Sequence, residues 1–433
     1  MKLYFEAEKF LKQSEGNLQS KVFNDKNLKS NPKHIYALVY STLKYKEYIQ
    51  QIITKSKINK QLKISNELLA LLIHDLLFSS RGRIESGKHH IKDSFLANKT
   101  RLQAEFIKLK LKYKVKSVDQ LPTVEQDDET PIRWFRINTI KIDPERFFKK
   151  HKLNLQPVSR FQDLTKPGLI YQDDHIPNLY GVHPKEKITT STEAYKLGEI
   201  IIQDRASCFP AYILNYKDEH SKIIDACAAP GNKTSHAASF VEDVVYAVEK
   251  DSKRVGILKQ MSEKATGKNK KKLIQVLHQD FTTIKPEDYE DVTGLIVDPS
   301  CSGSGIFGRA MDEETKNSDR LEKLASFQFT IMKHALSFPG ARKVVYSTCS
   351  VHAEENERVV VDLLSDETVK NQGWTLADRE VVLSTWERRG IEDEFMTLTR
   401  DSEVIKKLAG GCIRTIPKED GGIGFFAACF VKK

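Results

Sequence analysis

The sequence lacks closely spaced cysteines. Its six cysteines form no CxxC pair: Cys208, Cys227, Cys301, Cys349, Cys412 and Cys429. Structural zinc sites and secreted disulfide scaffolds both rely on cysteines at short, regular spacings, so this pattern argues against both. We therefore expect no metal, and reduced thiols in an intracellular protein.

Long apolar runs are also missing. No stretch approaches the roughly 18 apolar residues that a membrane span needs. The opening MKLYFEAEKFLKQSEG has no apolar core of the kind found in signal peptides, so we expect no membrane. With 39% hydrophobic and 30% charged residues, the 433-residue chain has the composition of a globular protein with two or three domains.

Positive charge is concentrated at the front of the chain. Residues 1–120 hold 24 Lys and Arg against 11 Asp and Glu, whereas the whole chain has a net charge of +10. A basic segment joined to a near-neutral remainder favours a polyanionic partner, most simply nucleic acid. A solvated, lysine-rich helical surface explains the same counts, and charge alone does not separate the two interpretations.

Three parts differ in their residue patterns. Residues 1–120 have apolar residues at helical spacing and predict a basic helical domain. Residues 121–185 open with a proline- and acid-rich linker and predict a small, RRM-like α+β module. In residues 186–433, apolar strand-like runs alternate with helical stretches, which is typical of a doubly wound α/β sheet buried on both faces. The runs GCIRTIP and GFFAACFVK predict a terminal hairpin.

The first strand of this sheet leads into the loop DACAAPGNKTSH, residues 225–236. Ala228, Ala229 and Gly231 are small, so the backbone can approach a ligand closely. Pro230 stiffens the turn, and Asn232 tolerates a left-handed backbone. The loop is neither a GxGxxG fingerprint nor a P-loop. Since ligands of open α/β sheets bind beyond the carboxyl ends of the strands, we expect a ligand at this loop.

Two acids follow the next two strands. Glu249, in YAVEKDSKR, lies where an acid can accept hydrogen bonds from both ribose hydroxyls. Asp280, in LHQDF, could contact an adenine amino group, although strand-end aspartates often only form turns. A helix N-terminal acid explains Asp251 better than Glu249. Together, the loop and the two acids predict a pocket for a nucleoside-containing cofactor.

The fourth and fifth strands each end near a cysteine. Asp298 and Cys301 lie in LIVDPSCSGSGIF, and Cys349 lies in KVVYSTCS. Taken alone, Cys349 fits a small buried residue better than a nucleophile. Neighbouring strand ends of a doubly wound sheet meet in one cleft, however, so we expect two thiols and a carboxylate beside the cofactor. Two separate buried cysteines and a redox pair are the alternatives.

This set of groups suits methylation at carbon 5 of a pyrimidine. A thiolate that adds to carbon 6 makes carbon 5 nucleophilic enough to take a methyl group from a sulfonium donor. An acid beside ring nitrogen 3 stabilises the developing charge, and loss of the carbon-5 hydrogen then allows the thiol to leave. Amino-group methylation would instead need an aromatic residue after a (D/N)PP pair, and DPSC supplies none.

The segments DACAAPGNKT, DPSCSGSG and YSTCS, in this order, resemble the Sun/NSUN family of S-adenosylmethionine-dependent RNA cytosine-5 methyltransferases. The resemblance covers about residues 130–433, including RWFRINTIK and IIIQDRASCFPAYIL. It implies a Rossmann-like class I methyltransferase core with a mostly parallel seven-stranded sheet. The helical front end and the form DPSCSGSG resemble the eukaryotic branch that modifies large-subunit ribosomal RNA.

The resemblance also implies roles for individual residues. Cys349 would be the nucleophile, Cys301 would assist release of the product, and Asp298 would hold the cytosine, with Lys233 also in the catalytic set. The residues implied to bind S-adenosylmethionine are Cys227, Ala228, Ala229, Pro230, Gly231, Asn232, Lys233, Glu249, Arg254, Asp280 and Asp298. The commoner loop is PGGKT where this chain has Asn232, and the commoner fourth motif has proline directly before the cysteine, where this chain has Ser300.

Several alternatives stay open at this point. DNA cytosine methyltransferases use the cysteine of the fourth motif as nucleophile, so the roles of the two thiols could be exchanged. The substrate could be DNA, or the chain could be an idle RNA-binding assembly factor on a methyltransferase scaffold. The resemblance favours ribosomal RNA or its precursor particle as partner, a monomer, and a nuclear, nucleolar location.

Overall fold

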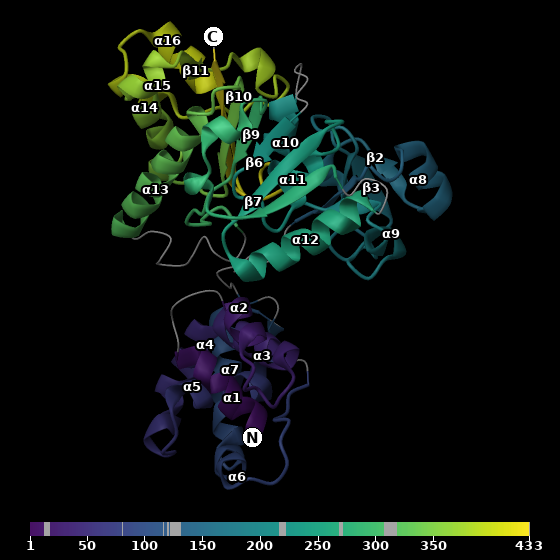
Figure 1. The fold of residues 1–433 in the computed structure, drawn as a ribbon. Helices are drawn as coiled ribbons and strands as arrows, with labels where there is room; N and C mark the ends of the chain where they lie inside the picture. The colour runs from purple at the N-terminus through teal and green to yellow at the C-terminus, as the bar shows by residue number, and fades with distance from the viewer. Residues whose placement is uncertain are drawn as a thin grey trace. The chain divides into compact units, whose positions relative to one another are not determined.

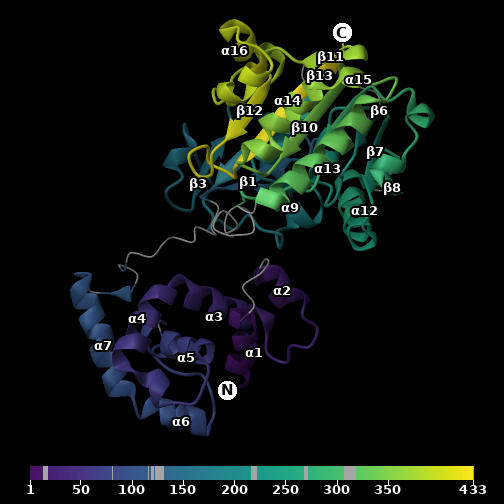
Figure 2. The same ribbon diagram turned by 90° about the vertical axis from the view of Figure 1, so that its left-hand side faces the viewer.

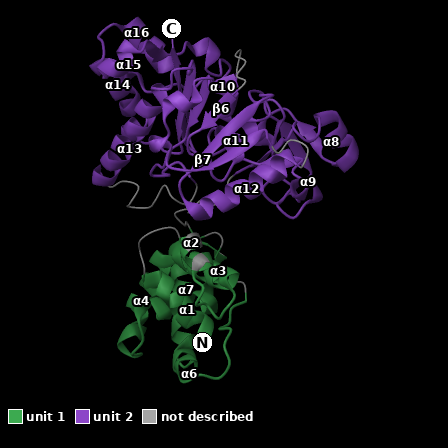
Figure 3. Cartoon of the chain, in the orientation of Figure 1, with its two compact units in different colours: residues 1–127 green, residues 128–433 purple. Residues whose placement is uncertain are grey.

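The computed structural model describes residues 1–12, 18–79, 81–115, 117–118, 121, 131–215, 222–267, 272–306 and 318–432. These residues fall into two compact units, 1–127 and 128–433 (Figure 3). The linker that the sequence predicts around residue 121 lies almost entirely outside the described residues. None of the helices in the described ranges is long and apolar enough to cross a membrane.

The first unit is helical in its described parts. Its elements are α1 (Lys2–Lys12), α2 (Leu18–Asn24), α3 (Pro32–Lys44), α4 (Lys46–Ser56), η1 (Ile58–Lys60), α5 (Asn66–Ile73), η2 (His74–Phe78), α6 (His90–Leu96) and α7 (Lys99–Lys112). One core joins them, and it includes Tyr4, Ile49, Leu72 and Phe95. On α7 the buried face carries Leu102, Phe106 and Leu109. Lysines in the last turn of α7 stabilise the helix, because their positive charge lies at the negative end of the helix dipole.

The second unit begins with a small α+β module. Its elements are β1 (Arg133–Ile137), α8 (Pro144–His151), β2 (Gln156–Val158), η4 (Phe161–Asp163), β3 (Leu169–Gln172), β4 (Leu179–Val182), α9 (Glu193–Lys196) and β5 (Ile200–Ile202). The sheet order is β2-β3-β4-β1-β5. Because β5 pairs with β1, this sheet extends past the boundary that the sequence suggested at residue 185.

A larger sheet forms the centre of the second unit. Its strands are β6 (Lys222–Asp225), β7 (Val244–Glu249), β8 (Ile274–His278), β9 (Gly294–Val297), β10 (Lys343–Thr348), β11 (Trp374–Leu376), β12 (Cys412–Thr415) and β13 (Phe425–Lys432). Seven strands follow the order β11-β13-β10-β9-β6-β7-β8, and β12 pairs with β13 as an eighth. The strands from β6 to β10 run parallel, whereas β11, β12 and β13 form the antiparallel part (Figure 2). The predicted terminal hairpin is β12 and β13.

Helices and short turns connect these strands. They are η5 (Ala206–Cys208), α10 (Phe209–Asn215), α11 (Asn232–Ala237), α12 (Ser252–Thr266), η7 (Phe281–Thr283), η8 (Pro286–Tyr289), α13 (Ser318–Leu336), η10 (Ala353–Glu355), α14 (Glu357–Ser365), α15 (Glu367–Asn371), η11 (Arg379–Val381), η12 (Glu392–Thr397) and α16 (Ser402–Gly410). In Figure 1, α11 and α12 cover one face of the sheet, and α13 and α14 cover the other.

Alternation along each strand supplies both cores. In β10, Val345 packs into the core that includes α10 and α11, whereas Val344 and Tyr346 pack into the core that includes α13 and α14. Side chains of a strand point alternately to opposite faces, so a strand buried on both sides must be apolar throughout. Strand β6 pairs with β7 on one side and with β9 on the other, so the order of the strands along the chain reverses at β6. Sheets of this kind bind ligands at such a switch point.

Candidate active site

The thiols of Cys301 and Cys349 meet at the ends of two neighbouring strands. β9 and β10 are parallel partners, and each cysteine follows the carboxyl end of its strand. The two Sγ atoms lie 3.1 Å apart. Hydrogen bonding to Cys349, burial and nearby negative charge raise the pKa of the Cys301 thiol well above its usual range. Cys301 therefore stays protonated at neutral pH and can donate its hydrogen to Cys349.

Asp298 lies beside this pair and is held from two sides. The Ser347 hydroxyl donates to Oδ1 at 2.6 Å, and Lys233 Nζ lies 2.8 Å from Oδ2. Burial alone would lower the pKa of Lys233, but negative charge nearby, chiefly that of Asp298, outweighs burial and raises the pKa. Lys233 is therefore a cation at neutral pH, and it fixes the carboxylate at the mouth of the cleft.

A cavity of about 270 Å³ opens onto the same strand ends. Eight of the residues that the sequence singled out line it: Cys227, Ala229, Glu249, Arg254, Asp280, Asp298, Cys301 and Cys349. Lys233 reaches this group through its ion pair with Asp298. The structure thus places both thiols, the carboxylate and the cofactor acids around one space.

The remaining predicted residues shape the loop without lining the cavity. Ala228 packs into the core, and Pro230 is exposed after a cis peptide bond. The left-handed residue is Gly231, with a φ of +110°, and not Asn232, which is the first residue of α11. The tolerance of Asn232 for a left-handed backbone is not used, because the glycine before it takes that conformation without steric cost.

Glu249 and Arg254 form the side of the cavity that follows β7. Glu249 is buried; its carboxylate accepts from Asp251 N at 2.9 Å and lies 3.3 Å from Arg254 Nη1. Arg254 also donates to the Ala229 carbonyl at 2.7 Å, which ties the glycine loop to the acid. Asp251 caps α12 by accepting from two backbone amides, so its role is structural, as the sequence suggested.

Asp280 stands at the far end of the cavity. Its Oδ1 accepts from the backbone amide and the hydroxyl of Thr282, and Lys250 lies 3.6 Å from its carboxylate. These hydrogen bonds and the lysine lower the pKa of Asp280, so it is ionised at neutral pH. The turn-forming interpretation and a place on the cavity wall both hold for this residue.

Three carboxyl groups near the site were not singled out from the sequence: Asp225 and Glu355 are buried, and Asp204 is half-buried. Asp225 accepts from the Thr234 hydroxyl at 2.6 Å, and burial raises its pKa to about 6. Asp204 accepts from Ala206 N at 3.0 Å, and burial likewise raises its pKa to about 6. Glu355 is fully buried and binds the loop that carries Cys301. Of the three, only Asp225 could have been found from the sequence, because it ends a predicted strand. The surroundings of Asp204 and Glu355 depend on how distant segments pack.

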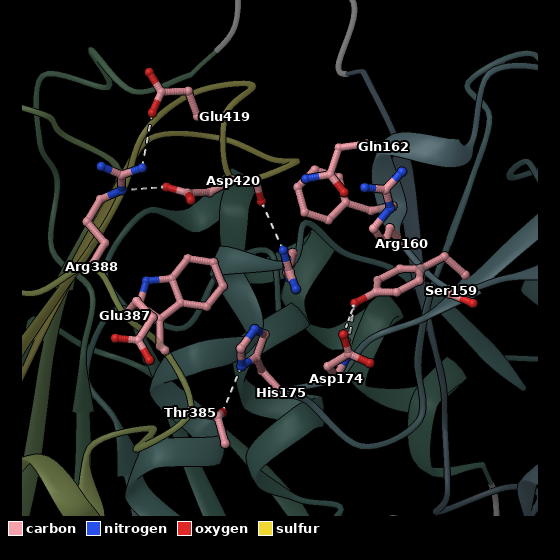
Figure 4. Close-up of a pocket in the computed structure, with 14 residues that line it drawn as sticks. Ser159, Arg160, Gln162, Asp174, His175, Thr385, Glu387, Arg388, Glu419 and Asp420 are labelled. Carbon is pink, nitrogen blue, oxygen red and sulfur yellow. Dashed lines mark hydrogen bonds and ion pairs between the residues drawn. The ribbon is translucent and has the colours of Figure 1, made fainter.

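A second cavity of about 520 Å³ lies within the same unit, between the module and C-terminal segments (Figure 4). Arg205 lines it; its guanidinium lies 5.0 Å from the Trp386 ring and pairs with buried Asp173. At the rim, Arg388 pairs with Glu419 and Asp420. Arg205 also donates to the Asp420 carbonyl, so it links Asp173 of the module to the C-terminal segments on the other side of the cavity.

The fold and its strand-end loops define a class I S-adenosylmethionine-dependent methyltransferase. A family profile described as "16S rRNA methyltransferase RsmB/F" matches residues 211–431. A second, "NOL1/NOP2/Sun domain family member 5, N-terminal domain", matches residues 33–121. The chain belongs to the Sun/NSUN family of ribosomal RNA cytosine-5 methyltransferases, and its cofactor is S-adenosylmethionine.

Relatives extend over nearly the whole chain. The chain is 42% identical to the 25S rRNA (cytosine-C(5))-methyltransferase rcm1 of Schizosaccharomyces pombe, over 96% of this chain and 88% of that protein. It is 32% identical to a 28S rRNA (cytosine-C(5))-methyltransferase of Mus musculus, over 96% and 87%. A methyltransferase homolog from Pyrococcus horikoshii shares the fold, with a TM-score of 0.55, 23% identity, and coverage of 71% and 89%.

The cavity fits the cofactor of this family. The side chains of Ala226, Cys227 and Ala229 are small, which leaves room for the methionine part of the cofactor to lie along the loop. The Glu249 carboxylate lines the same cavity. Among the described residues, no group of three or more His, Cys, Asp or Glu side chains is arranged to hold a metal ion.

Proposed function

We propose that this protein methylates carbon 5 of a cytosine in large-subunit ribosomal RNA. The observation that carries the proposal is the thiol pair at 3.1 Å beside Asp298, at the edge of the cofactor cavity. The names of the fission yeast and mouse relatives support the choice of ribosomal RNA. Their large-subunit substrates also support a nuclear, nucleolar site of action, and we expect a monomer.

Each residue has a defined part in the reaction. When bound, S-adenosylmethionine supplies the methyl group. The Cys349 thiolate adds to carbon 6, and carbon 5 forms a bond to the methyl group as the sulfonium–methyl bond breaks. Asp298 and Lys233 hold the cytosine ring at nitrogen 3 and the amino group. The carbon-5 proton is then lost to water. The electron pair of the broken C–H bond restores the double bond between carbons 5 and 6 and expels Cys349 as a thiolate, to which the Cys301 thiol can donate a hydrogen bond.

The parts of the chain divide the binding of RNA. The basic helices of residues 1–120 and the module of residues 121–185 supply phosphate contacts, and the catalytic part, 186–433, supplies base choice after the cytosine leaves its stack. The module's Trp134 donates to the Gly421 carbonyl at 2.7 Å, which supports a fixed placement of module and catalytic sheet.

The decisive experiment is methyl transfer from labelled cofactor to RNA fractions, followed by bisulfite sequencing of ribosomal RNA with and without the protein. We expect label in large-subunit RNA at one cytosine. Label removed by DNase instead of RNase would identify DNA as the substrate. Absence of transfer to every RNA fraction would favour an idle assembly factor.

Cysteine variants test the thiol roles. Cys349→Ala is expected to abolish both methyl transfer and the covalent RNA adduct on denaturing gels, because it removes the nucleophile. Cys301→Ala is expected to accumulate the adduct, because release slows. The reverse pattern would exchange the two roles.

A further inference from the structure

Glu355 is a fully buried carboxylate that the reaction described above does not use. It lies in the turn η10, six residues after Cys349. Among the described residues, no Lys, Arg or His forms an ion pair with it. Burying a carboxylate is costly unless strong hydrogen bonds compensate. The buried Glu355 carboxylate therefore needs hydrogen-bond donors, and the loop that carries Cys301 supplies them.

The bonds of Glu355 go to the residue that follows Cys301. Its Oε1 accepts from Ser302 N at 2.8 Å, and its Oε2 accepts from the Ser302 hydroxyl at 2.5 Å. Gln328 Nε2 donates to Oε1 at 3.0 Å and to the Ser300 carbonyl at 3.1 Å. Glu355 and Gln328 thus hold the peptide groups on both sides of Cys301.

The residues after the two thiols are also joined to each other. The Ser350 hydroxyl lies 3.2 Å from that of Ser302 and 3.1 Å from that of Ser304. Ser304 accepts from Val351 N at 3.0 Å. Each cysteine is therefore followed by a serine of one buried cluster, and Glu355 is the charged member of the network.

The Cys301 loop depends on these bonds because it has little regular structure of its own. Residues 299–303 form no helix or strand, and Gly303 has a φ of +72°. A backbone without ladder hydrogen bonds takes its position from side chains that satisfy its polar groups. Only an acceptor with two oxygens can take both donors of Ser302 while keeping Gln328, and a carboxylate is such a group.

We propose that Glu355 is a positioning residue that holds the Cys301 thiol against Cys349 and thereby sets the rate at which methylated RNA is released. The inference rests on the proposed thiol roles. We call the hydrogen bonds from Glu355 and Gln328 to the Cys301 loop the clamp. The clamp maintains the 3.1 Å contact between the two sulfur atoms. The negative charge of Glu355 also helps to raise the pKa of Cys301, after hydrogen bonding to Cys349 and burial.

The first test follows the covalent RNA adduct in Glu355→Gln. The amide keeps the shape of the side chain but can no longer accept both Ser302 donors. We expect release of methylated RNA to slow about tenfold, the loss of one charge-assisted hydrogen bond, and the adduct to accumulate while the first methyl transfer changes much less. A purely structural role would lower adduct, methyl transfer and melting temperature together, and that outcome would overturn the inference.

A second variant and a matched control guard this test. Ser302→Ala removes only the hydroxyl donor, so it gives a smaller accumulation of adduct in a chain that folds even if Glu355→Gln does not. Glu354→Gln changes the preceding carboxylate, which pairs with Arg358 at the surface. It is expected to release RNA at the wild-type rate.

A third measurement is independent of RNA. Diamide takes the two thiol hydrogens and forms a Cys301–Cys349 disulfide, whose rate is measured by mass spectrometry of the RNA-free protein. We expect this rate to fall severalfold in Glu355→Gln and to stay unchanged in Glu354→Gln. Failure of adduct formation in the wild-type protein would refute the proposed function, whereas wild-type rates of both release and disulfide formation in Glu355→Gln would refute the clamp alone.

Discussion

Replacing Asp225 with Asn is expected to change how stability depends on pH. Asp225 ends the first strand of the large sheet, is 1% exposed, and has a pKa raised from 3.8 to about 6, chiefly by burial. Its Oδ2 accepts from the Thr234 hydroxyl. Between pH 3.8 and about 6, the folded chain therefore holds a proton on this carboxyl that the unfolded chain releases.

The sign and size follow from linkage. Below pH 3.8 both states are protonated, and Asp225 has no effect on the pH dependence. As the pH rises from 3.8 to about 6, the unfolded state loses the proton first, so the free energy of unfolding falls. The gap between the two pKa values corresponds to about 3 kcal/mol, and the loss is complete above pH 6 to 7.

The assay compares thermal unfolding of Asp225→Asn and wild type from pH 4 to pH 8, without cofactor. Relative to wild type, the variant is expected to gain about 2.4 kcal/mol between pH 4 and pH 7, or about 4 °C for a unit of about 300 residues. Any fixed effect of the amide on packing is the same at each pH and cancels in this difference. Surface Asp243→Asn controls for the loss of one negative charge. A stability difference that stays constant over this pH range would refute the reasoning.

Three further predictions concern cofactor, substrate and RNA. Glu249→Gln is expected to weaken S-adenosylmethionine binding about 10- to 100-fold in calorimetric titration, with kcat at saturating cofactor little changed, because one charged acceptor is lost. Ser347→Ala frees one oxygen of Asp298 and is expected to lower kcat/KM about tenfold, while the melting temperature falls by only about 2 °C. Deleting residues 1–118 is expected to weaken RNA binding and to flatten its salt dependence in filter-binding assays, because fewer counterions are released; an unchanged slope would leave the lysines as a solvated surface.

The large sheet could be predicted because its strands are buried on both faces. Apolar runs such as KVVY and GLIV are short, rich in β-branched residues and bounded by turn residues, and these features distinguish them from a buried helix. The short strands β5 and β11 were not predicted. Each has only three residues and exists because a longer neighbour supplies its hydrogen bonds, β1 for β5 and β13 for β11. Pairing across the chain is not encoded in a three-residue pattern.

The cavity could be predicted as far as topology determines it. Asp298, Cys301 and Cys349 follow strands that are parallel neighbours, so the rule for strand ends was enough to bring them together. Asp204 and Glu355 could not be found this way. Buried Glu355 accepts from the amide of Ser302, and half-buried Asp204 accepts from the amide of Ile423. Contacts with segments this far along the chain leave no local signal in the sequence.

The serine before Cys301 illustrates how one loop reaches its geometry by another route. In the commoner form of this motif a proline precedes the cysteine and fixes one backbone angle. Here Ser300 leaves that angle free, and Gln328 holds its carbonyl while Glu355 holds the amide of Ser302. The two sulfur atoms still meet at 3.1 Å. Because hydrogen bonds replace the ring, the direction of the Cys301 thiol depends on residues far along the chain, which is why the sequence around the cysteine could not determine it.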